Sequence, residues 1–182
     1  MLTIHLHGHP VLRKKASEVS VNEPHLQEFI DEMFETMYNA EGVGLAAPQV
    51  GRSLRLFIVD TKGFKETYPD TELFKEVFIN PEIIETLGDD FNFNEGCLSL
   101  PEIREDVVRK SEVILTYTNE EGERKTTHFK GLAARVILHE IDHLNGHVFT
   151  DRVSSIRKMI IKKKLNDIAS GKTKPKYKSK HH

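Results

Sequence analysis

The sequence predicts a single α+β domain over residues 1–168. Segments with the pattern of strands gather between residues 54 and 129, and segments with the pattern of helices lie before and after them. This segregation is typical of α+β folds, whereas alternation of strands and helices indicates α/β folds. No repeat or linker divides the chain. Its 182 residues, 38% of them hydrophobic, are enough to bury one core without disulfides.

The first predicted helix follows Asn22 and Pro24. Glycine disfavours helix, so Gly42 and Gly44 indicate that this helix ends before residue 42. Its apolar residues recur at helical spacing and form one stripe that should pack in the core: Leu26, Phe29, Ile30, Met33 and Met37.

Apolar or alternating runs predict the strands that follow. The polar segment 61–71 contains Gly63 and Pro69 and is expected to be a surface excursion. The turn at residues 119–123 should join the last two strands as a hairpin. The strand candidates are residues 54–59, 77–79, 83–87, 107–108, 112–118 and 124–129.

Two further helices are predicted after the strands. The first begins at Gly131, and Gly146 suits its C-terminal cap. The second begins near Ser154 or Ser155, and its lysines are expected to face outward. Its apolar residues are expected to face inward: Ile156, Met159, Ile160, Leu165 and Ile168.

Composition limits the classes of function. The formal net charge of −2 argues against a protein built mainly to bind nucleic acid. Cys97 is the only cysteine, so no intramolecular disulfide is expected, which fits a reducing compartment. The N-terminus lacks the pattern of a signal peptide, and no apolar run approaches the roughly 20 residues that span a bilayer. We therefore expect a soluble cytoplasmic protein without a membrane partner.

Positive charge gathers near the C-terminus. Residues 169–182 are polar and rich in lysine, and they are expected to form a basic, disordered tail. The final His181 and His182 resemble the remnant of an expression tag.

The segment His139–His143 reads His-Glu-Ile-Asp-His and lies in the helix predicted to begin at Gly131. Residues four apart share one helix face, so both imidazoles can bind one metal ion. Glu140 lies between them and can act on a metal-bound water. This pattern is typical of metal-dependent hydrolases.

A catalytic metal site usually has three protein ligands, and the two histidines supply only two of them. One protease class places a third histidine where this chain has Phe149, and another uses a downstream Glu, of which none follows His143. Cys97, in the segment Glu95–Ser99, is the remaining candidate, because a divalent metal favours the thiolate. A buried inert cysteine and a nucleophile paired with a histidine stay open as alternatives.

The segment Gly42–Gln49 is rich in small residues, which let a backbone approach a ligand closely. The Gln49 side-chain amide could donate to a developing oxyanion. A tight connection between a helix and a strand is the alternative interpretation.

These three segments together resemble the peptide deformylase family. Its motifs are Gly-x-Gly-Leu-Ala-Ala-x-Gln, Glu-Gly-Cys-x-Ser and His-Glu-x-Asp-His, in that order. They match Gly42–Gln49, Glu95–Ser99 and His139–His143 without a mismatch, and the resemblance spans residues 1–168. It implies antiparallel and mixed β-sheets around a central helix that carries the His-Glu-x-x-His motif, followed by a C-terminal helix.

The resemblance also implies a role for each matching residue. It implies Fe²⁺ as the native metal, replaceable by Ni²⁺, Co²⁺ or Zn²⁺. Glu140 would be the general acid and base. The other implied roles are metal binding by Cys97, His139 and His143, oxyanion stabilisation by Gln49 and the Leu98 backbone N–H, and substrate contact by Val43 and Gly44.

The implied reaction is removal of formate from the N-formyl-methionine of nascent polypeptides, by attack of a metal-bound hydroxide on the formyl carbon. The implied partners are N-formyl-methionyl peptides and the ribosome, which the basic C-terminal helix and tail would contact; the protein would be a monomer. Two rival functions stay open: a metallopeptidase with the His-Glu-x-x-His motif, and an inactive deformylase-like binding protein. An inactive relative would be expected to lack Glu140 or a metal ligand.

Overall fold

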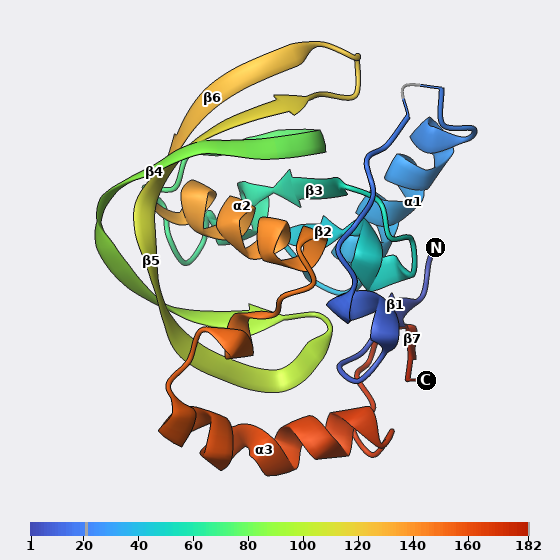
Figure 1. Cartoon of the computed structure of the whole chain (residues 1–182), viewed down its shortest axis with the longest axis vertical. Coiled ribbons are helices and arrows are strands. Elements are labelled where there is room, and N and C mark those ends of the chain that lie inside the picture. Colours follow the sequence, from blue (N-terminus) through green and yellow to red (C-terminus); the bar gives the residue numbers. More distant parts are fainter. Residues whose placement is uncertain (21, 182) are drawn as a thin grey trace.

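A curved five-stranded sheet surrounds one helix, α2 (Gly131–Leu144), in the computed structural model of the chain (Figure 1). The structure describes residues 1–20 and 22–181. Every neighbouring pair of strands in this sheet is antiparallel, and the predicted α+β class is confirmed. In spatial order the strands are β2 (Gly44–Ala46), β3 (Leu56–Asp60), β4 (Lys75–Cys97), β5 (Leu100–Thr118) and β6 (Arg124–Lys130).

Two long strands, β4 and β5, replace several of the short strands that the sequence predicts. The sequence predicts separate strands at residues 77–79 and 83–87, but β4 continues through Asn80 and Pro81 between them. The pairing with β5 shifts register there, and Asn80 adopts a φ of 48°. A bulge accommodates proline because its missing N–H leaves no ladder bond unpaired. The two strands therefore wrap around α2 and meet at the turn where Cys97 pairs with Leu100.

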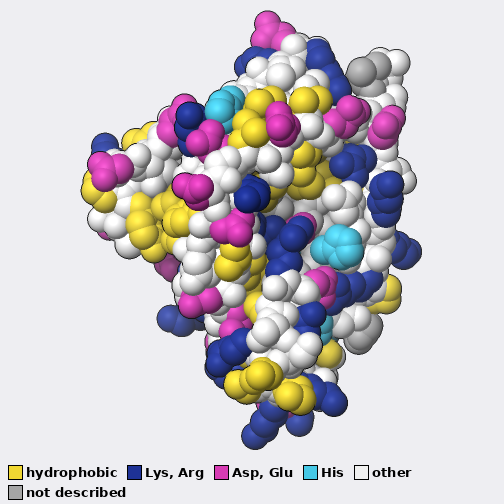
Figure 2. Space-filling model, turned by 60° about the vertical axis from the view of Figure 1, so that its left-hand side comes forward, with side chains coloured by type: hydrophobic (Ala, Val, Ile, Leu, Met, Phe, Trp, Pro, Cys, Tyr) yellow, Lys and Arg dark blue, Asp and Glu magenta, His cyan; other side chains and the backbone are white. Residues whose placement is uncertain are grey.

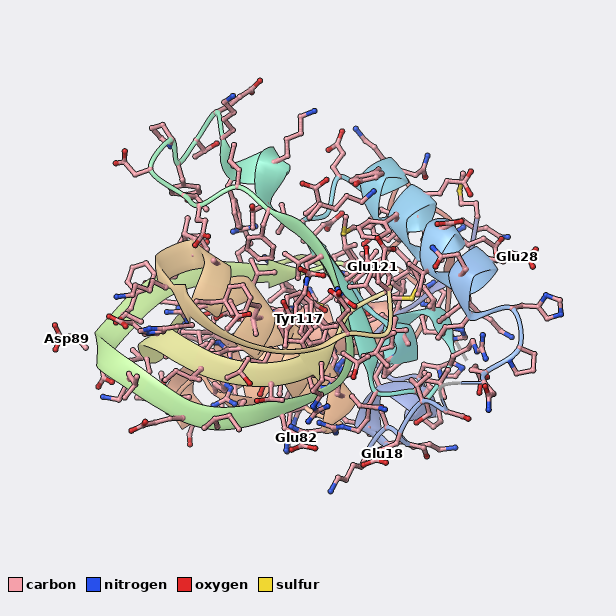
Figure 3. The ribbon with its side chains drawn as sticks, turned by 90° about the horizontal axis from the view of Figure 1, so that it is seen from above. Glu18, Glu28, Glu82, Asp89, Tyr117 and Glu121 are labelled. Carbon is pink, nitrogen blue, oxygen red and sulfur yellow. The ribbon has the colours of Figure 1, made fainter. Side chains whose placement is uncertain are left out.

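Helix α2 packs against aromatic side chains of the sheet. Ring centroids of Phe57 and Phe78 lie 4.5 Å apart, and those of Phe78 and Tyr117 lie 4.4 Å apart. Figure 3 shows Tyr117 inside the curve of the sheet, whereas Glu82 and Asp89 point away from it. Close packing of large rings holds α2 in one position relative to the strands.

A second hydrophobic cluster lies under the helix α1 (Leu26–Asn39). The helix ends before Gly42, as the sequence predicts, and the chain then enters β2 at the edge of the sheet. Leu26 of the predicted stripe is partly buried and packs against the cluster. The other residues of the stripe are buried: Phe29, Ile30, Met33 and Met37. Among the described residues, the 3₁₀ helices are η1 (Pro10–Arg13), η2 (Ala47–Val50), η3 (Thr61–Phe64) and η4 (Phe149–Asp151).

The C-terminal helix α3 (Ser155–Ala169) lies on the outside of the fold, and its orientation differs from the prediction. Ile156, Met159 and Ile160 were expected to face inward, but they are 66%, 69% and 59% exposed. Figure 2 shows hydrophobic side chains flanked by Lys and Arg at this end of the molecule.

An ion pair explains the orientation of α3. The guanidinium of Arg157 donates to the Glu105 carboxylate at 2.7 and 2.8 Å, and the Glu105 side chain is buried. A buried carboxylate requires a charged partner, so Arg157 occupies the inner face of the helix. Ile161, one turn further on, shares that face and is buried.

The chain returns to its own N-terminus after α3. A parallel two-stranded sheet joins β1 (Ile4–His5) to β7 (Ser179–Lys180). The Leu6 N–H donates to the Lys180 carbonyl at 2.9 Å, and the two ends of the chain lie close together in Figure 1. The disorder expected for residues 169–182 stays a prediction, while the structure places residues 179 and 180 in β7.

Exposed and partly buried residues alternate along the tail. Every second residue from 172 to 180 is an exposed lysine, while the odd-numbered residues between them are partly buried. This period of two is that of an extended chain with one face on the protein. His181 approaches the Ile168 carbonyl at 3.0 Å, and His182 lies outside the described residues, so the tag interpretation stays a prediction. None of the described helices is long and apolar enough to cross a membrane.

Candidate metal centre

Three side chains with metal-binding atoms converge where the turn between β4 and β5 meets α2. Cys97 Sγ lies 3.2 Å from His143 Nε2. Cys97, His139 and His143 each offer one ligand atom, and these atoms lie within 4.8 Å of one another. One thiolate and two imidazoles are a donor set that suits zinc and other borderline transition metals. The residues present therefore fit a bound metal ion, and the predicted third ligand lies beside the motif.

The environment of Cys97 favours its charged form. Burial alone raises the pKa of the thiol, but the positive charge of His143 and hydrogen bonds from His139 and His143 lower it to about 5. These contacts favour the thiolate, which is the form that coordinates metal. An inert cysteine in an apolar environment would have a raised pKa instead, so that alternative does not fit this site.

Glu95 orients the imidazole of His139. Its Oε2 lies 2.9 Å from His139 Nδ1, which leaves Nε2 available for a metal. Arg109 donates to both carboxylate oxygens at 2.7 and 3.0 Å, and Arg135 donates to Oε1 at 2.8 Å. Burial raises the pKa of Glu95, but these hydrogen bonds and charges outweigh it and hold that pKa well below its usual range.

The same buried network continues to Asp142. The Asp142 carboxylate accepts from Arg109 at 2.7 Å and from Arg152 at 2.7 and 2.5 Å. Glu95 and Asp142 thus share Arg109 as a partner. Both carboxylates are buried, and together they connect His139 with Arg152.

The arginines of this network were missed from sequence. For Arg109 the signal was the period of two along β5, where every second side chain from residue 101 to 109 is buried. An inward-facing charge in such a run indicates a buried partner of opposite charge. The inward residues are Ile103, Glu105, Val107 and Arg109.

Glu140 is a buried carboxylate without a complete set of partners. Its Oε2 has no hydrogen-bond partner among the described residues. Burial raises the pKa of Glu140 to about 7, although the charges of His139 and His143 oppose the shift. Its Oε1 lies so close to Gly44 that a Cβ there would overlap it. Such a carboxyl group can take up and release a proton near neutral pH.

Gln49 presents its amide to the same place. Its Oε1 accepts from the Ala46 N–H at 2.8 Å, which fixes the direction of the side chain. Its Nε2 donates to Ser99 Oγ at 3.2 Å and lies 3.5 Å from Cys97 Sγ. Ser99 was not singled out from sequence. Leu98, between Cys97 and Ser99, lines the cavity that lies over this centre.

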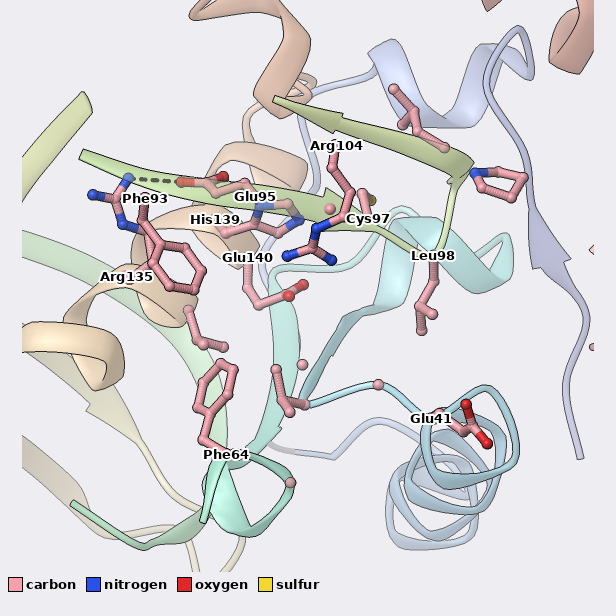
Figure 4. A pocket seen from close by; sticks show the side chains of 18 of the residues that line it. Glu41, Phe64, Phe93, Glu95, Cys97, Leu98, Arg104, Arg135, His139 and Glu140 are labelled. Atoms are coloured by element: carbon pink, nitrogen blue, oxygen red, sulfur yellow. Dashed lines mark hydrogen bonds and ion pairs between the residues drawn. The ribbon is translucent and has the colours of Figure 1, made fainter. Parts of the chain in front are cut away.

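A cavity of about 650 Å³ lies over these residues, and Figure 4 shows the Glu140 carboxylate pointing into it. Val43 and Gly44 line one side of the cavity, beside the edge strand β2. Phe64 and Tyr68 contribute aromatic surface from the segment predicted to be a simple excursion. Tyr68 also contacts Phe93 of β4 edge to face, with ring centroids 5.7 Å apart.

Curated relatives resemble this chain over nearly its whole length. A peptide deformylase of Christiangramia forsetii is 47% identical over 188 residues, covering 98% of this chain and 94% of the relative. A peptide deformylase of Flavobacterium johnsoniae is 49% identical over 181 residues, covering 96% of this chain and 92% of the relative.

Solved structures share the fold. The crystal structure of a peptide deformylase from Legionella pneumophila superposes with a TM-score of 0.83 at 38% identity, covering 94% of this chain and 97% of that one. A peptide deformylase from Synechococcus elongatus, in complex with actinonin, gives a TM-score of 0.79 at 40% identity, covering 94% and 87%.

The family model described as polypeptide deformylase matches residues 1–159, which include all three motifs. The order of those motifs, the convergence of Cys97 with two histidines of α2, and the relatives lead to one conclusion. This chain belongs to the polypeptide deformylase family, whose members are hydrolases.

Proposed function

We propose that this protein removes the formyl group from the N-formyl-methionine of nascent polypeptides and releases formate. The observation that carries the proposal is the position of the Cys97 sulfur beside the two histidines of α2, with Glu140 buried next to them. That arrangement would complete a three-ligand site and leave a carboxyl group to move protons.

Cys97, His139 and His143 would hold the metal. The proposed ion is Fe²⁺, with Ni²⁺, Co²⁺ or Zn²⁺ as substitutes, because thiolate and imidazole donors suit these borderline ions. The bound ion supplies a Lewis acid that polarises a carbonyl oxygen and lowers the pKa of water. Glu95 keeps His139 in the orientation that coordination needs.

The substrate peptide would lie along the edge strand β2. This strand pairs with β3 on one side, and Val43 and Gly44 line the cavity near its start. An extended peptide can add to such an edge through backbone hydrogen bonds. The apolar and aromatic walls around Phe64 and Phe93 would receive side chains of the substrate.

Glu140 would carry the proton through the reaction. Its raised pKa of about 7 lets it accept a proton from the attacking water and donate that proton to the departing amine nitrogen. The amide of Gln49 and the backbone N–H of Leu98 would stabilise the oxygen of the tetrahedral intermediate. Loss of one such donor typically costs about 3 kcal/mol in transition-state stabilisation.

The two rival functions fit the residues less well. Phe149, at the position where one protease class has its third histidine, is buried with its ring 6.1 Å from that of His139 and offers no ligand atom. An inactive binding protein would be expected to have lost Glu140 or a ligand, yet Glu140, Cys97 and both histidines are present.

Formate release from formyl-Met-Ala-Ser tests the proposal. The metal-loaded wild type should release formate and leave the internal peptide bonds intact. Glu140→Ala should keep its metal, because Glu140 is not a proposed ligand, and should lose at least about 100-fold in kcat, the lower range for general acid–base catalysis. Formate and free amine are measured in the same samples, alongside metal content.

The exposed Glu121→Ala, in the turn between β5 and β6, serves as the control and should match the wild type. Cleavage of internal bonds without formate would establish the peptidase, and no turnover with metal bound would establish the binding protein. Near-normal rates in Glu140→Ala would remove the role proposed for that residue.

Cys97→Ser should weaken metal retention. A neutral hydroxyl is a poorer ligand for these ions than the thiolate, whose pKa of about 5 keeps it charged. After identical dialysis, the variant should contain less than half the metal of the wild type, as measured by elemental analysis. An equal metal content would show that Cys97 is not a ligand.

We further propose that the protein is a cytoplasmic monomer that contacts ribosomal RNA through α3 and the tail. Lys162, Lys163 and Lys164 are exposed on α3, and the tail lysines all lie on its outer face. Figure 2 shows positive side chains gathered at this end of the molecule. Neutralising phosphates with such lysines makes binding dependent on salt.

Ribosome binding should fall steeply between low and physiological salt. Changing Lys162, Lys163 and Lys164 together to Gln should weaken binding and reduce the salt slope by about 0.7–0.9 for each phosphate that is no longer neutralised. Co-sedimentation with ribosomes measures both quantities. A control with Lys14, Lys15 and Lys65 changed to Gln has the same net charge and should bind like the wild type. An equal weakening of binding in both variants would contradict a specific interaction through α3.

A further inference from the structure

The turn between β4 and β5 is held by the C-terminal tail. The hydroxyl of Tyr177 donates a hydrogen bond to the Leu98 carbonyl at 2.5 Å. Tyr177 is partly buried against the hydrophobic cluster under α1, and its side chain lines the cavity over the metal centre. A residue 79 positions away in sequence thus contacts the backbone next to Cys97.

The next carbonyl of the same turn is held by the other end of the chain. The N–H of His7, two residues after the end of β1, donates to the Ser99 carbonyl at 2.8 Å. Successive carbonyls, those of Leu98 and Ser99, are therefore bound from outside the sheet by the two terminal segments of the protein.

The pairing of β1 with β7 joins the segment that carries His7 to the segment that carries Tyr177. The Ile4 N–H donates to the Lys178 carbonyl at 3.0 Å, and Lys178 follows Tyr177 directly. The position of Tyr177 is thus fixed by the strand beside it. Removing the tail would free the Leu98 carbonyl and also remove the strand that lies along β1.

The orientation of Leu98 matters because its N–H is a proposed oxyanion donor. A peptide chain has two soft torsions per residue, and Leu98 lies between two fixed points. The Cys97 side chain is one point, at the metal centre, and the carbonyl bound by Tyr177 is the other. The bound carbonyl lies in the peptide plane that follows the one with the Leu98 N–H, so holding it limits how the Leu98 backbone can rotate. A fixed donor is what preorganised stabilisation requires.

We infer that the C-terminal tail is a part of the active site and that Tyr177 is a positioning residue for the Leu98 N–H. This inference rests on the proposed deformylation. Tyr177 acts through its hydroxyl on the backbone, whereas substrate contact and metal binding are assigned to other residues.

The variant Tyr177→Phe tests the inference, because it keeps the ring and removes only the hydroxyl. We expect kcat for formyl-Met-Ala-Ser to fall about tenfold, less than the 100-fold that a displacement of 1 Å can cause. KM should change less than about twofold and metal content should not change, since the interaction matters most in the transition state. A rate equal to that of the wild type would overturn the inference.

Tyr117→Phe is the matched control. It also removes a tyrosine hydroxyl, one that lies 3.4 Å from Glu76 and away from the cavity, and it should keep wild-type kcat. Thermal unfolding of both variants is recorded, so that a loss of stability is recognised. A drop in kcat of equal size in both variants would indicate a general structural effect and contradict the positioning role.

Hydrogen exchange gives a second measurement that does not require turnover. In metal-loaded Tyr177→Phe, the backbone amides of residues 97–100 should exchange faster than in the wild type, while those of α2 stay unchanged. Unaltered exchange across the turn would also overturn the inference. If the wild type itself releases no formate, the proposed function fails, and the exchange result still decides whether Tyr177 orders the turn.

Discussion

The buried carboxylate of Glu95 accepts hydrogen bonds from Arg109, Arg135 and His139, and this cluster connects three parts of the fold. Glu95 lies on β4, Arg109 on β5, and the other two on α2. A buried charge is tolerated only when its partners are complete, so each element must keep its place for the cluster to exist. Because Glu95 precedes Cys97 by two residues, the contact that orients His139 also brings the thiolate beside the imidazoles.

The proposed chemistry follows from burial at two different carboxylates. Glu95 has charged donors around it and stays ionised, so it can hold a ligand. Glu140 has fewer partners, and burial raises its pKa toward neutrality, so it can exchange protons. Gly44 permits this placement of Glu140 because any side chain would occupy the same space. Glu95 therefore suits the holding of a ligand and Glu140 the transfer of a proton, because their pKa values are shifted in opposite directions.

Sequence alone predicted much of the centre because metal chemistry imposes local spacing. His139 and His143 lie one helical turn apart. Because a catalytic metal site needs a third protein ligand, the sequence indicated Cys97 as the candidate. The supporting contacts were not predictable in the same way, because their partners are distant in sequence: Arg135 lies 40 residues from Glu95, and Tyr177 lies 79 residues from Leu98. The helices and hairpin were predicted by local patterns, whereas the orientation of α3 depended on its pairing with the buried Glu105. In the tail the lysine-rich composition predicts disorder, whereas the alternation of its lysines has the period of two of an extended chain.

The central claim is that a single metal ion is bound jointly by the sheet and by α2. Crystals of protein loaded with Ni²⁺, measured at the nickel absorption edge, test it directly. The account predicts one strong anomalous peak per chain, coordinated by Cys97, His139 and His143, with Glu95 still hydrogen-bonded to His139. A peak coordinated by the histidines without Cys97, or one located elsewhere in the molecule, would contradict it.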